Sequence, residues 1–280
     1  MKLYETILPS IAWQRIVGAV AWLDQRSGRP LARVAGRVEK RFFGGLESTH
    51  CLRFADPEGD EGFFIYSFVS QAILLLFPYV EELWEAGFPD ALPPAGRRKL
   101  MSCYKSCLRR QLHACGPDKT MLCKATQFCG GVESLRTAFP DARFVTIMRD
   151  PEQALASHLS LFHSVWRLHS PNLSHDSPTS HAFARLGVAW YRHLFAFGQK
   201  ADPKRYFCLD YGELTRDPMT EVERLYAHFG WTMSAVCRAR LEEASRHQKE
   251  YKSTHRYTLE EFGLSRSWIR QELGQQTKNW

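Results

Sequence analysis

The chain has 280 residues, of which 44% are hydrophobic and 24% charged, fractions that are ordinary for a globular protein and argue against long disorder. Its formal net charge of +7 suits an anionic ligand or surface, but an excess of this size is also common in proteins that bind neither. A chain of this length can bury one substantial α/β core or two small ones.

The first part of the chain predicts helices. Amphipathic patterns indicate helices over residues 9–26 and 31–42, each ending at glycine. An uncharged run from Gly62 to Val80 is long enough to span a bilayer. Serine, glutamine and proline interrupt this run, and acidic residues flank it where basic anchors would be expected. We therefore expect a buried core helix, which continues to about Ala86. A basic helix over residues 97–113 follows a link rich in proline and glycine.

Strands alternate with helices in the rest of the chain. Apolar runs predict three strands, over residues 120–123, 144–148 and 206–209. A stretch rich in Ser, Pro, His and Asn, residues 168–181, predicts a loop. This order indicates a parallel sheet flanked by helices. We expect a single α/β domain over residues 1–280, with a helical part over 1–115 and a βα core over 116–280.

The turn after the second of these strands has the features of an anion site. The strand ends at Arg149, and Asp150 and Pro151 are typical of a helix N-cap and first residue, with Gln153 placed to complete a capping box. A helix N-terminus and a nearby guanidinium both favour an anion. Ser157 follows two helical turns on, about 10 Å along the axis, where its hydroxyl can meet the far side of the same anion.

These residues resemble a known element. Arg149-Asp150-Pro151, with a serine eight positions after the arginine, resembles the 3′-phosphate-binding element of sulfotransferases that use 3′-phosphoadenosine 5′-phosphosulfate (PAPS). Three further segments resemble that family in the same order, especially its bacterial branch: residues 124–150, 206–231 and 255–265. The resemblance implies a P-loop-like parallel sheet and transfer of a sulfuryl group from PAPS, without a metal. The acceptor would be a hydroxyl or amine of a small molecule, glycan or lipid, and no nucleic-acid partner is expected.

One feature of that family is not found. Its members begin with a strand and a loop of the Gly-Thr-Thr kind, whose backbone N–H groups hold the 5′-phosphosulfate. No glycine of this chain has such surroundings, and the opening run of residues 2–8 leads into Pro9. We therefore expect that the first strand and its loop are missing because the sequence is an N-terminally truncated reading. If the chain is complete, we expect marginal stability or a partner that supplies the strand.

The resemblance also implies roles for single residues. Arg149 and Ser157 would bind the 3′-phosphate, and Tyr211 would lie near the adenine. Lys124 would stabilise charge that builds on the bridging oxygen during transfer. His255 and Arg256 are expected to close over the nucleotide. Each role has a simpler alternative: a structural arginine, a neutral helix serine, a packed tyrosine, an exposed lysine and a segment that caps the core.

The acceptor hydroxyl needs a general base. Cytosolic members of the family use a histidine two residues after the lysine, where this chain has Thr126. Other members use a glutamate. Asp60 and Glu61, together with Glu58, lie in a segment similar to an acidic motif of the bacterial branch and are the candidates. A solvated acidic loop is the alternative.

Cysteines and histidines add little chemistry. The eight cysteines form no Cys-x-x-Cys pair, and no secretory signal precedes them, so a reduced, cytoplasmic protein is expected. Four histidines recur every six residues from His163 to His181, a spacing that fits neither a helix face nor a zinc site. Gly130 and Gly131 lack the Lys-Ser/Thr ending of a phosphate loop and predict a turn before a helix.

Three classes of function stay open at this point. The first is a PAPS-dependent sulfotransferase. The second is a non-catalytic relative that binds a nucleotide or a partner. The third, which is not favoured, is a peripheral membrane protein that uses the basic helices and the apolar segment.

Overall fold

A computed structural model describes most of the chain: residues 9–43, 59–60, 62–65, 69–116, 119–124, 126–250 and 258–274. It divides into two compact units, of which the first comprises Met1–Phe77 with Leu83–Ala138 and the second Pro78–Glu82 with Phe139–Trp280. The single domain over residues 1–280 stays a prediction. We expected the first strand and its loop to be missing. Residues 1–8 and 44–58, which bear on that prediction, lie outside the described residues.

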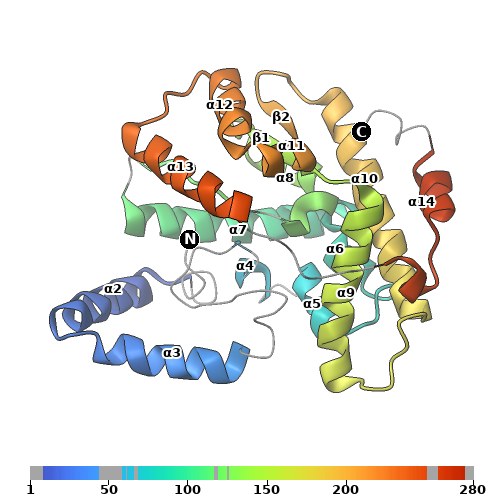
Figure 1. Cartoon of the computed structure of the whole chain (residues 1–280), viewed down its shortest axis with the longest axis horizontal. Helices are drawn as coiled ribbons and strands as arrows, with labels where there is room; N and C mark the ends of the chain where they lie inside the picture. The colour runs from blue at the N-terminus through green and yellow to red at the C-terminus, as the bar shows by residue number, and fades with distance from the viewer. Residues whose placement is uncertain are drawn as a thin grey trace. The chain divides into compact units, whose positions relative to one another are not determined.

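The first unit is helical (Figure 1). Its elements are α2 (Ile11–Arg26), α3 (Pro30–Phe43), α4 (Gly62–Ile65), α5 (Gln71–Leu76), α6 (Trp84–Gly87), η1 (Pro89–Ala91), α7 (Pro94–Cys115), η2 (Thr126–Gly130) and α8 (Val132–Ala138). The expected helices over residues 9–26, 31–42 and 97–113 are confirmed as α2, α3 and α7. A short-range cap starts α2, because the Ser10 hydroxyl accepts a hydrogen bond from the Trp13 N–H at its first turn.

Aromatic side chains around α7 form the core of the first unit. Tyr104 of α7 is buried between Phe64 and Phe128, with ring centroids 4.8 Å and 5.3 Å from its own. The Gly130–Gly131 turn packs beside this cluster. A Cβ on Gly130 would lie 2.7 Å from the Gly87 carbonyl oxygen, so close backbone packing accounts for that glycine. The prediction of a turn before a helix is confirmed, because α8 begins at Val132.

The expected long helix over residues 62–86 is wrong. The run is divided into α4, α5 and α6, although Phe63, Phe64, Ile73 and Leu74 are buried as a core segment should be. Ser70 begins a new helix because its hydroxyl accepts the Ala72 N–H at 3.1 Å. Among the described residues, no helix has the combined length and apolar character that crossing a membrane requires.

The expected strand over residues 120–123 is also wrong. The described segment 119–124 has no regular secondary structure, and Leu122 is 88% exposed. A strand exists through backbone pairing with a neighbour, and the described sheet consists of two other strands. The apolar run alone therefore did not decide the conformation here.

The second unit carries that sheet. Its elements are β1 (Phe144–Met148), α9 (Pro151–His169), α10 (Pro178–Lys200), β2 (Tyr206–Asp210), α11 (Tyr211–Arg216), α12 (Pro218–His228), α13 (Ala235–Glu250), η3 (Glu260–Phe262) and α14 (Arg266–Leu273). β1 and β2 pair in parallel, with Phe144 opposite Tyr206 and Met148 opposite Asp210. Both strands were predicted and are confirmed. The chain is thus a helix-rich α/β protein with a small parallel sheet, whose P-loop-like form stays a prediction.

Helices α9 and α10 pack through an aromatic core. The rings of Phe162 and Phe183 lie 4.2 Å apart, and Trp166 is fully buried beside them. The loop expected over residues 168–181 is shorter in the structure, because α9 continues to His169 and α10 begins at Pro178. His163 and His175 stack on each other with ring centroids 3.9 Å apart. In the described ranges, no group of three side chains is placed to hold a metal ion.

His158 makes stability depend on pH. Its ring packs against Phe162, Phe183 and Trp190, and burial lowers its pKa from 6.5 to about 4. Below pH 6.5 the unfolded chain therefore binds a proton that the folded chain does not. We expect the melting temperature to fall as the pH is lowered from 6.5 toward 4, and His158→Phe to flatten this part of the profile. An equally steep profile in His158→Phe would show that other groups cause the loss.

Candidate functional site

Two predicted ligand residues meet at the carboxyl edge of the sheet. Arg149 directly follows β1, and Tyr211 directly follows β2, whose last residues Met148 and Asp210 are opposite each other. The guanidinium carbon of Arg149 lies 5.0 Å from the centre of the Tyr211 ring, within the range of a cation–π contact. The parallel register thus brings together two residues that are 62 positions apart.

The Arg149 side chain keeps hydrogen-bonding capacity. Its Nε atom is buried and donates to no described residue, and its guanidinium forms no ion pair within the described part of the chain. Its backbone is fixed, because the Tyr191 hydroxyl of α10 donates to the Arg149 carbonyl oxygen at 2.8 Å. A held backbone and an unused guanidinium donor are what an anion-binding arginine needs.

The start of α9 adjoins this arginine. The Asp150 carboxylate accepts the Gln153 N–H at 3.0 Å, and Pro151 occupies the first turn, as predicted. The return bond of a capping box, from the Gln153 side chain, is not among the hydrogen bonds of the described residues, so that part of the prediction is wrong. Ser157 lies on α9 two turns from Asp150 and is partly exposed.

The predicted catalytic residues belong to the first unit. Lys124 is exposed at the end of the irregular segment 119–124. Asp60 is fully buried, and its carboxylate accepts a hydrogen bond from the Tyr104 hydroxyl. Burial and the Asp60 carboxylate raise the pKa of Tyr104, and the same two causes raise that of Cys123 to about 11. Asp60 and Tyr104 therefore form a polar pair inside the unit.

Other predicted site residues cannot be placed. Glu58, Glu61, His255 and Arg256 lie outside the described residues. Thr126 accepts a hydrogen bond from the Gln71 side chain at 3.2 Å.

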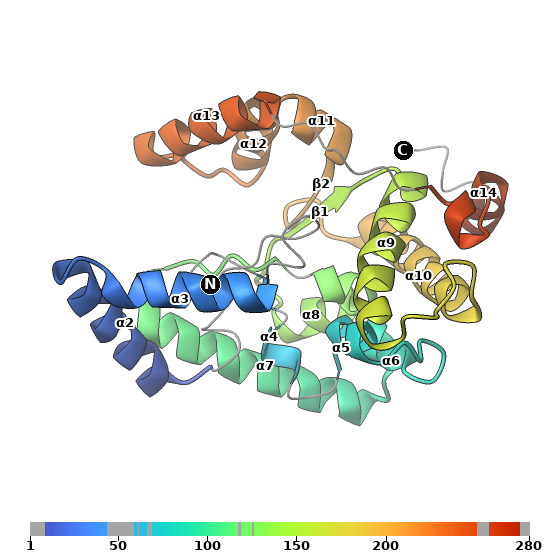
Figure 2. The same cartoon turned by 60° about the horizontal axis from the view of Figure 1, so that its bottom comes forward.

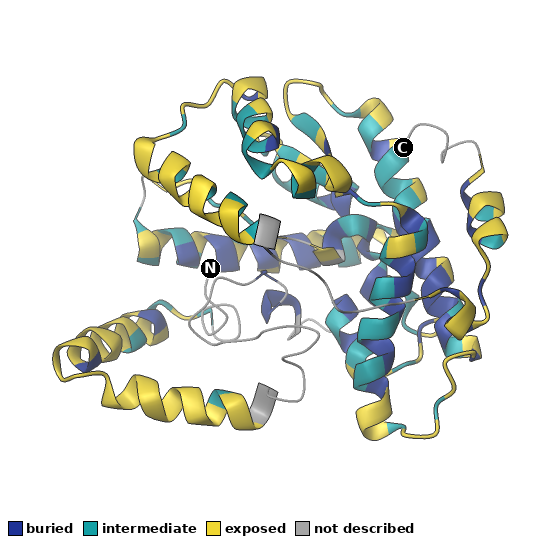
Figure 3. Ribbon diagram, viewed as in Figure 1, coloured by how far each residue is buried: buried dark blue, intermediate teal, exposed yellow. Residues whose placement is uncertain are grey.

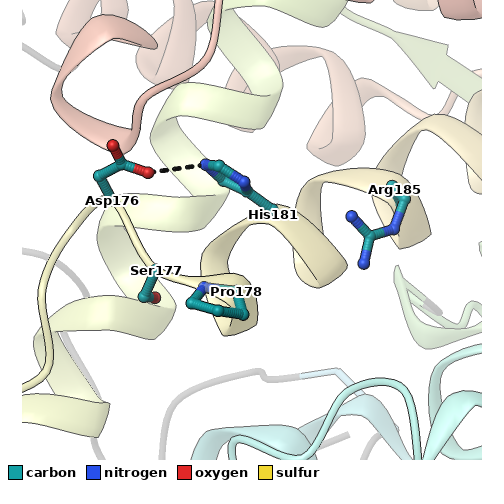
Figure 4. Close-up of a pocket in the computed structure, with 5 residues that line it drawn as sticks. All are labelled: Asp176, Ser177, Pro178, His181 and Arg185. Carbon is teal, nitrogen blue, oxygen red and sulfur yellow. Dashed lines mark ion pairs between the residues drawn. The ribbon is translucent and has the colours of Figure 1, made fainter.

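A pocket of about 300 Å³ opens at the start of α10 (Figure 4), lined by Asp176, Ser177, Pro178, His181 and Arg185. His181 Nε2 lies 2.9 Å from the Asp176 carboxylate, and Arg185 pairs with Glu81. Both basic side chains already face carboxylates, so the pocket offers little to an anion. Tyr191, which binds the Arg149 carbonyl, lies ten residues after His181, about 15 Å further along the helix. The pocket is therefore separate from the Arg149 turn.

The comparison with known families agrees with this geometry. A family model described as "Sulfotransferase family" matches residues 81–235, which is more than half of the chain. The match contains both strands, the Arg149 turn and Tyr211. The chain belongs to the sulfotransferase family.

Curated relatives of this sulfotransferase family member come from mycobacteria. An omega-hydroxy-beta-dihydromenaquinone-9 sulfotransferase, Stf3, is 28% identical over 141 residues, both in Mycobacterium bovis (strain ATCC BAA-935 / AF2122/97) and in Mycobacterium tuberculosis (strain CDC 1551 / Oshkosh). Each alignment covers 50% of this chain and 36% of the relative. The match thus spans little more than a third of the length of the curated relatives.

Solved structures share the fold of this chain. Sulfotransferase STF9 from Mycobacterium avium matches with a TM-score of 0.71 and 19% identity, over 90% of this chain and 64% of that chain. Sulfotransferase STF1 from Mycobacterium tuberculosis H37Rv matches with a TM-score of 0.62 and 19% identity, over 98% and 68% of the two chains. At this identity the likeness concerns the fold.

Two residues of the chain were not singled out from the sequence. Tyr191 holds the Arg149 backbone, and Tyr104 binds Asp60. Each partner is more than 40 positions away, so no local motif identifies the pair. The sequence feature that could have identified them is a tyrosine in a predicted helix, because a buried tyrosine hydroxyl needs a hydrogen-bond partner.

Proposed function

We propose that this chain transfers a sulfuryl group from PAPS to an acceptor hydroxyl. The observation that carries the proposal is the convergence of Arg149 and Tyr211 at the carboxyl edge of the two parallel strands. Ligands of open α/β folds bind at that edge. The unused Arg149 donor beside the start of α9 supports an anionic group of the nucleotide there.

The nucleotide-binding roles follow from this placement. Arg149 donates its planar fork to the 3′-phosphate, and the Ser157 hydroxyl donates to the same group. Tyr211 contributes its ring to the adenine, in contact with the Arg149 guanidinium. His255 and Arg256 are proposed to close over the nucleotide from the C-terminal side.

The catalytic roles belong to residues of the first unit. The donor supplies the sulfuryl group, and the acceptor oxygen bonds to sulfur as the bond to the 5′-phosphate oxygen breaks. Lys124 stabilises the charge on that departing oxygen. Asp60 or Glu61 takes the proton of the acceptor hydroxyl.

The acceptor class is inferred from the curated relatives. Their name assigns them a hydroxylated menaquinone derivative, which is a lipid-like quinone. We propose that this chain also takes an apolar, lipid-like alcohol. A small, water-soluble alcohol that reacts as fast as a long-chain one would contradict this choice.

Turnover of radiolabelled PAPS with a long-chain alcohol tests the proposal. We expect labelled sulfate ester to accumulate, and Lys124→Ala to lower kcat by roughly a hundredfold while the affinity for 3′,5′-ADP stays within about twofold. Lys119→Ala is the matched control, since Lys119 is also exposed in the same irregular segment. Binding of 3′,5′-ADP without any transfer would identify a non-catalytic nucleotide-binding relative. Absence of both would overturn the proposal.

A further inference from the structure

Helices α2 and α3 each expose a row of apolar side chains. The apolar residues recur at helical spacing on both helices. They are Trp13, Ile16, Val20 and Leu23 on α2, and Leu31, Val34 and Val38 on α3. Four of them are more than half exposed, with Ile16 at 57%, Leu23 at 59%, Leu31 at 55% and Val34 at 53%. We call these seven residues the hairpin stripe. Figure 2 shows the two helices joined by their short turn.

This exposure is unusual for an amphipathic helix. Such a helix normally buries its apolar side against the core. Here every side chain of α3 from Pro30 to Val38 is exposed (Figure 3). Exposed apolar patches of this kind mark surfaces that bind a partner or a membrane. The α3 helix therefore contributes little to the core of its own unit.

The hairpin is nevertheless held in shape. The Asp24 carboxylate at the end of α2 accepts the N–H groups of Leu31 and Ala32 at 2.7 Å and 3.0 Å, which caps α3. On another side of α2, the Gln14 amide donates to the Gln111 side chain of α7 at 2.6 Å. These bonds fix the turn and anchor α2, so the stripe is presented by a defined structure.

Charge on the two helices narrows the choice of partner. Residues 11–43 contain seven basic side chains and two acidic ones, and one of the acidic pair, Asp24, is used in the cap. The basic residues are Arg15, Arg26, Arg29, Arg33, Arg37, Lys40 and Arg41. On α3, Arg33, Arg37 and Lys40 recur at helical spacing on the side away from the stripe. The Arg26 guanidinium lies 3.9 Å over the Trp22 ring.

We propose that the α2–α3 hairpin docks on the surface of an anionic phospholipid bilayer. An apolar stripe with tryptophan, beside a strongly basic face, is the composition of helices that lie in the bilayer interface without crossing it. The stripe enters the boundary between headgroups and acyl chains, and the arginines reach the anionic headgroups. Docking does not depend on sulfotransfer, although it would bring the enzyme to a lipid-like acceptor.

Co-sedimentation of the full chain with vesicles tests this proposal. We expect binding to vesicles of phosphatidylcholine and phosphatidylglycerol in equal parts, weaker binding to phosphatidylcholine alone, and release at high salt. Arg33→Glu with Arg37→Glu should lower the partition coefficient roughly twentyfold. Val34→Ser with Val38→Ser should lower it roughly tenfold without changing the charge. Far-UV circular dichroism checks the fold, which these exposed positions should leave intact.

The matched control is Arg240→Glu with Arg246→Glu, an equal charge change on exposed residues of α13. It should retain binding within about twofold. An equal loss in this control would mean that net charge alone drives binding and would overturn the proposal. So would the absence of vesicle binding, or light scattering that shows a dimer broken by the valine substitutions. None of these measurements needs a nucleotide. A failure of the docking proposal is therefore distinguishable from a failure of the proposed function.

Discussion

Replacing Arg149 by alanine is expected to lower the affinity for 3′,5′-ADP by roughly a hundredfold. The proposed contact is a charge-assisted fork on a phosphate, and its loss should cost about 3 kcal/mol. The adjoining Tyr211 ring and the cap of α9 remain in place, so the fold should be retained. Isothermal titration calorimetry with 3′,5′-ADP measures the effect, and thermal unfolding of the same sample checks the fold.

Two further variants test whether the planar guanidinium of Arg149, and not only its positive charge, binds the phosphate. Arg149→Lys keeps the charge but loses the planar pair of donors, so we expect an intermediate affinity. Arg143→Ala removes an exposed arginine at the opposite end of β1 and should bind like the wild type. If Arg149→Ala binds 3′,5′-ADP unchanged, the nucleotide site is elsewhere and the convergence with Tyr211 is structural.

The features that the sequence predicted well are those that local chemistry decides. Asp150 precedes a proline and accepts an N–H of the next turn, as its position implied. The strands that end beside Arg149 and Tyr211 were predicted from their apolar runs. The meeting of these two residues then follows from a parallel register.

The features that failed depend on distant partners. The run from Gly62 to Val80 carries no charged residue, but Ser70 caps a new helix inside it. From the sequence alone, Ser70 fits a buried serine within one long helix equally well. Residues 120–123 have strand-like composition and no described strand beside them. Composition cannot predict whether a neighbour is available.

Asp60 shows that predictions for the candidate site also depend on distant partners. Asp60 was predicted from an acidic motif as a base for the acceptor, with a solvated loop as the alternative. The structure places its carboxylate inside the first unit, on a tyrosine 44 positions away. The local sequence is the same whether the Asp60 carboxylate is solvated in a loop or buried. Its burial depends on Tyr104 and on the rings of Phe64 and Phe128 around that tyrosine. Asp60 as the base stays a prediction.

Replacing Tyr104 by phenylalanine is expected to destabilise the chain by about 2 kcal/mol. The substitution removes the hydroxyl that donates to a fully buried carboxylate, and a buried charged acceptor is costly when it loses a donor. Urea unfolding followed by tryptophan fluorescence measures the change. Tyr226→Phe is the matched control, because its hydroxyl bonds within the described part of the chain only to the Cys237 sulfur, at 3.4 Å, and its loss should cost less than about 0.5 kcal/mol.

Asp60→Asn completes the cycle and separates structure from catalysis. The asparagine oxygen can still accept from Tyr104, so this variant alone should cost less than Tyr104→Phe. The double variant should be more stable than the sum of the single effects implies, by about 1 kcal/mol, because both changes weaken the same charge-assisted hydrogen bond. If Asp60 is the base, Asp60→Asn also abolishes sulfate transfer at temperatures where it is folded, whereas Tyr104→Phe retains measurable turnover. Full turnover in folded Asp60→Asn would restrict Asp60 to the structural pair and leave Glu61 as the candidate base.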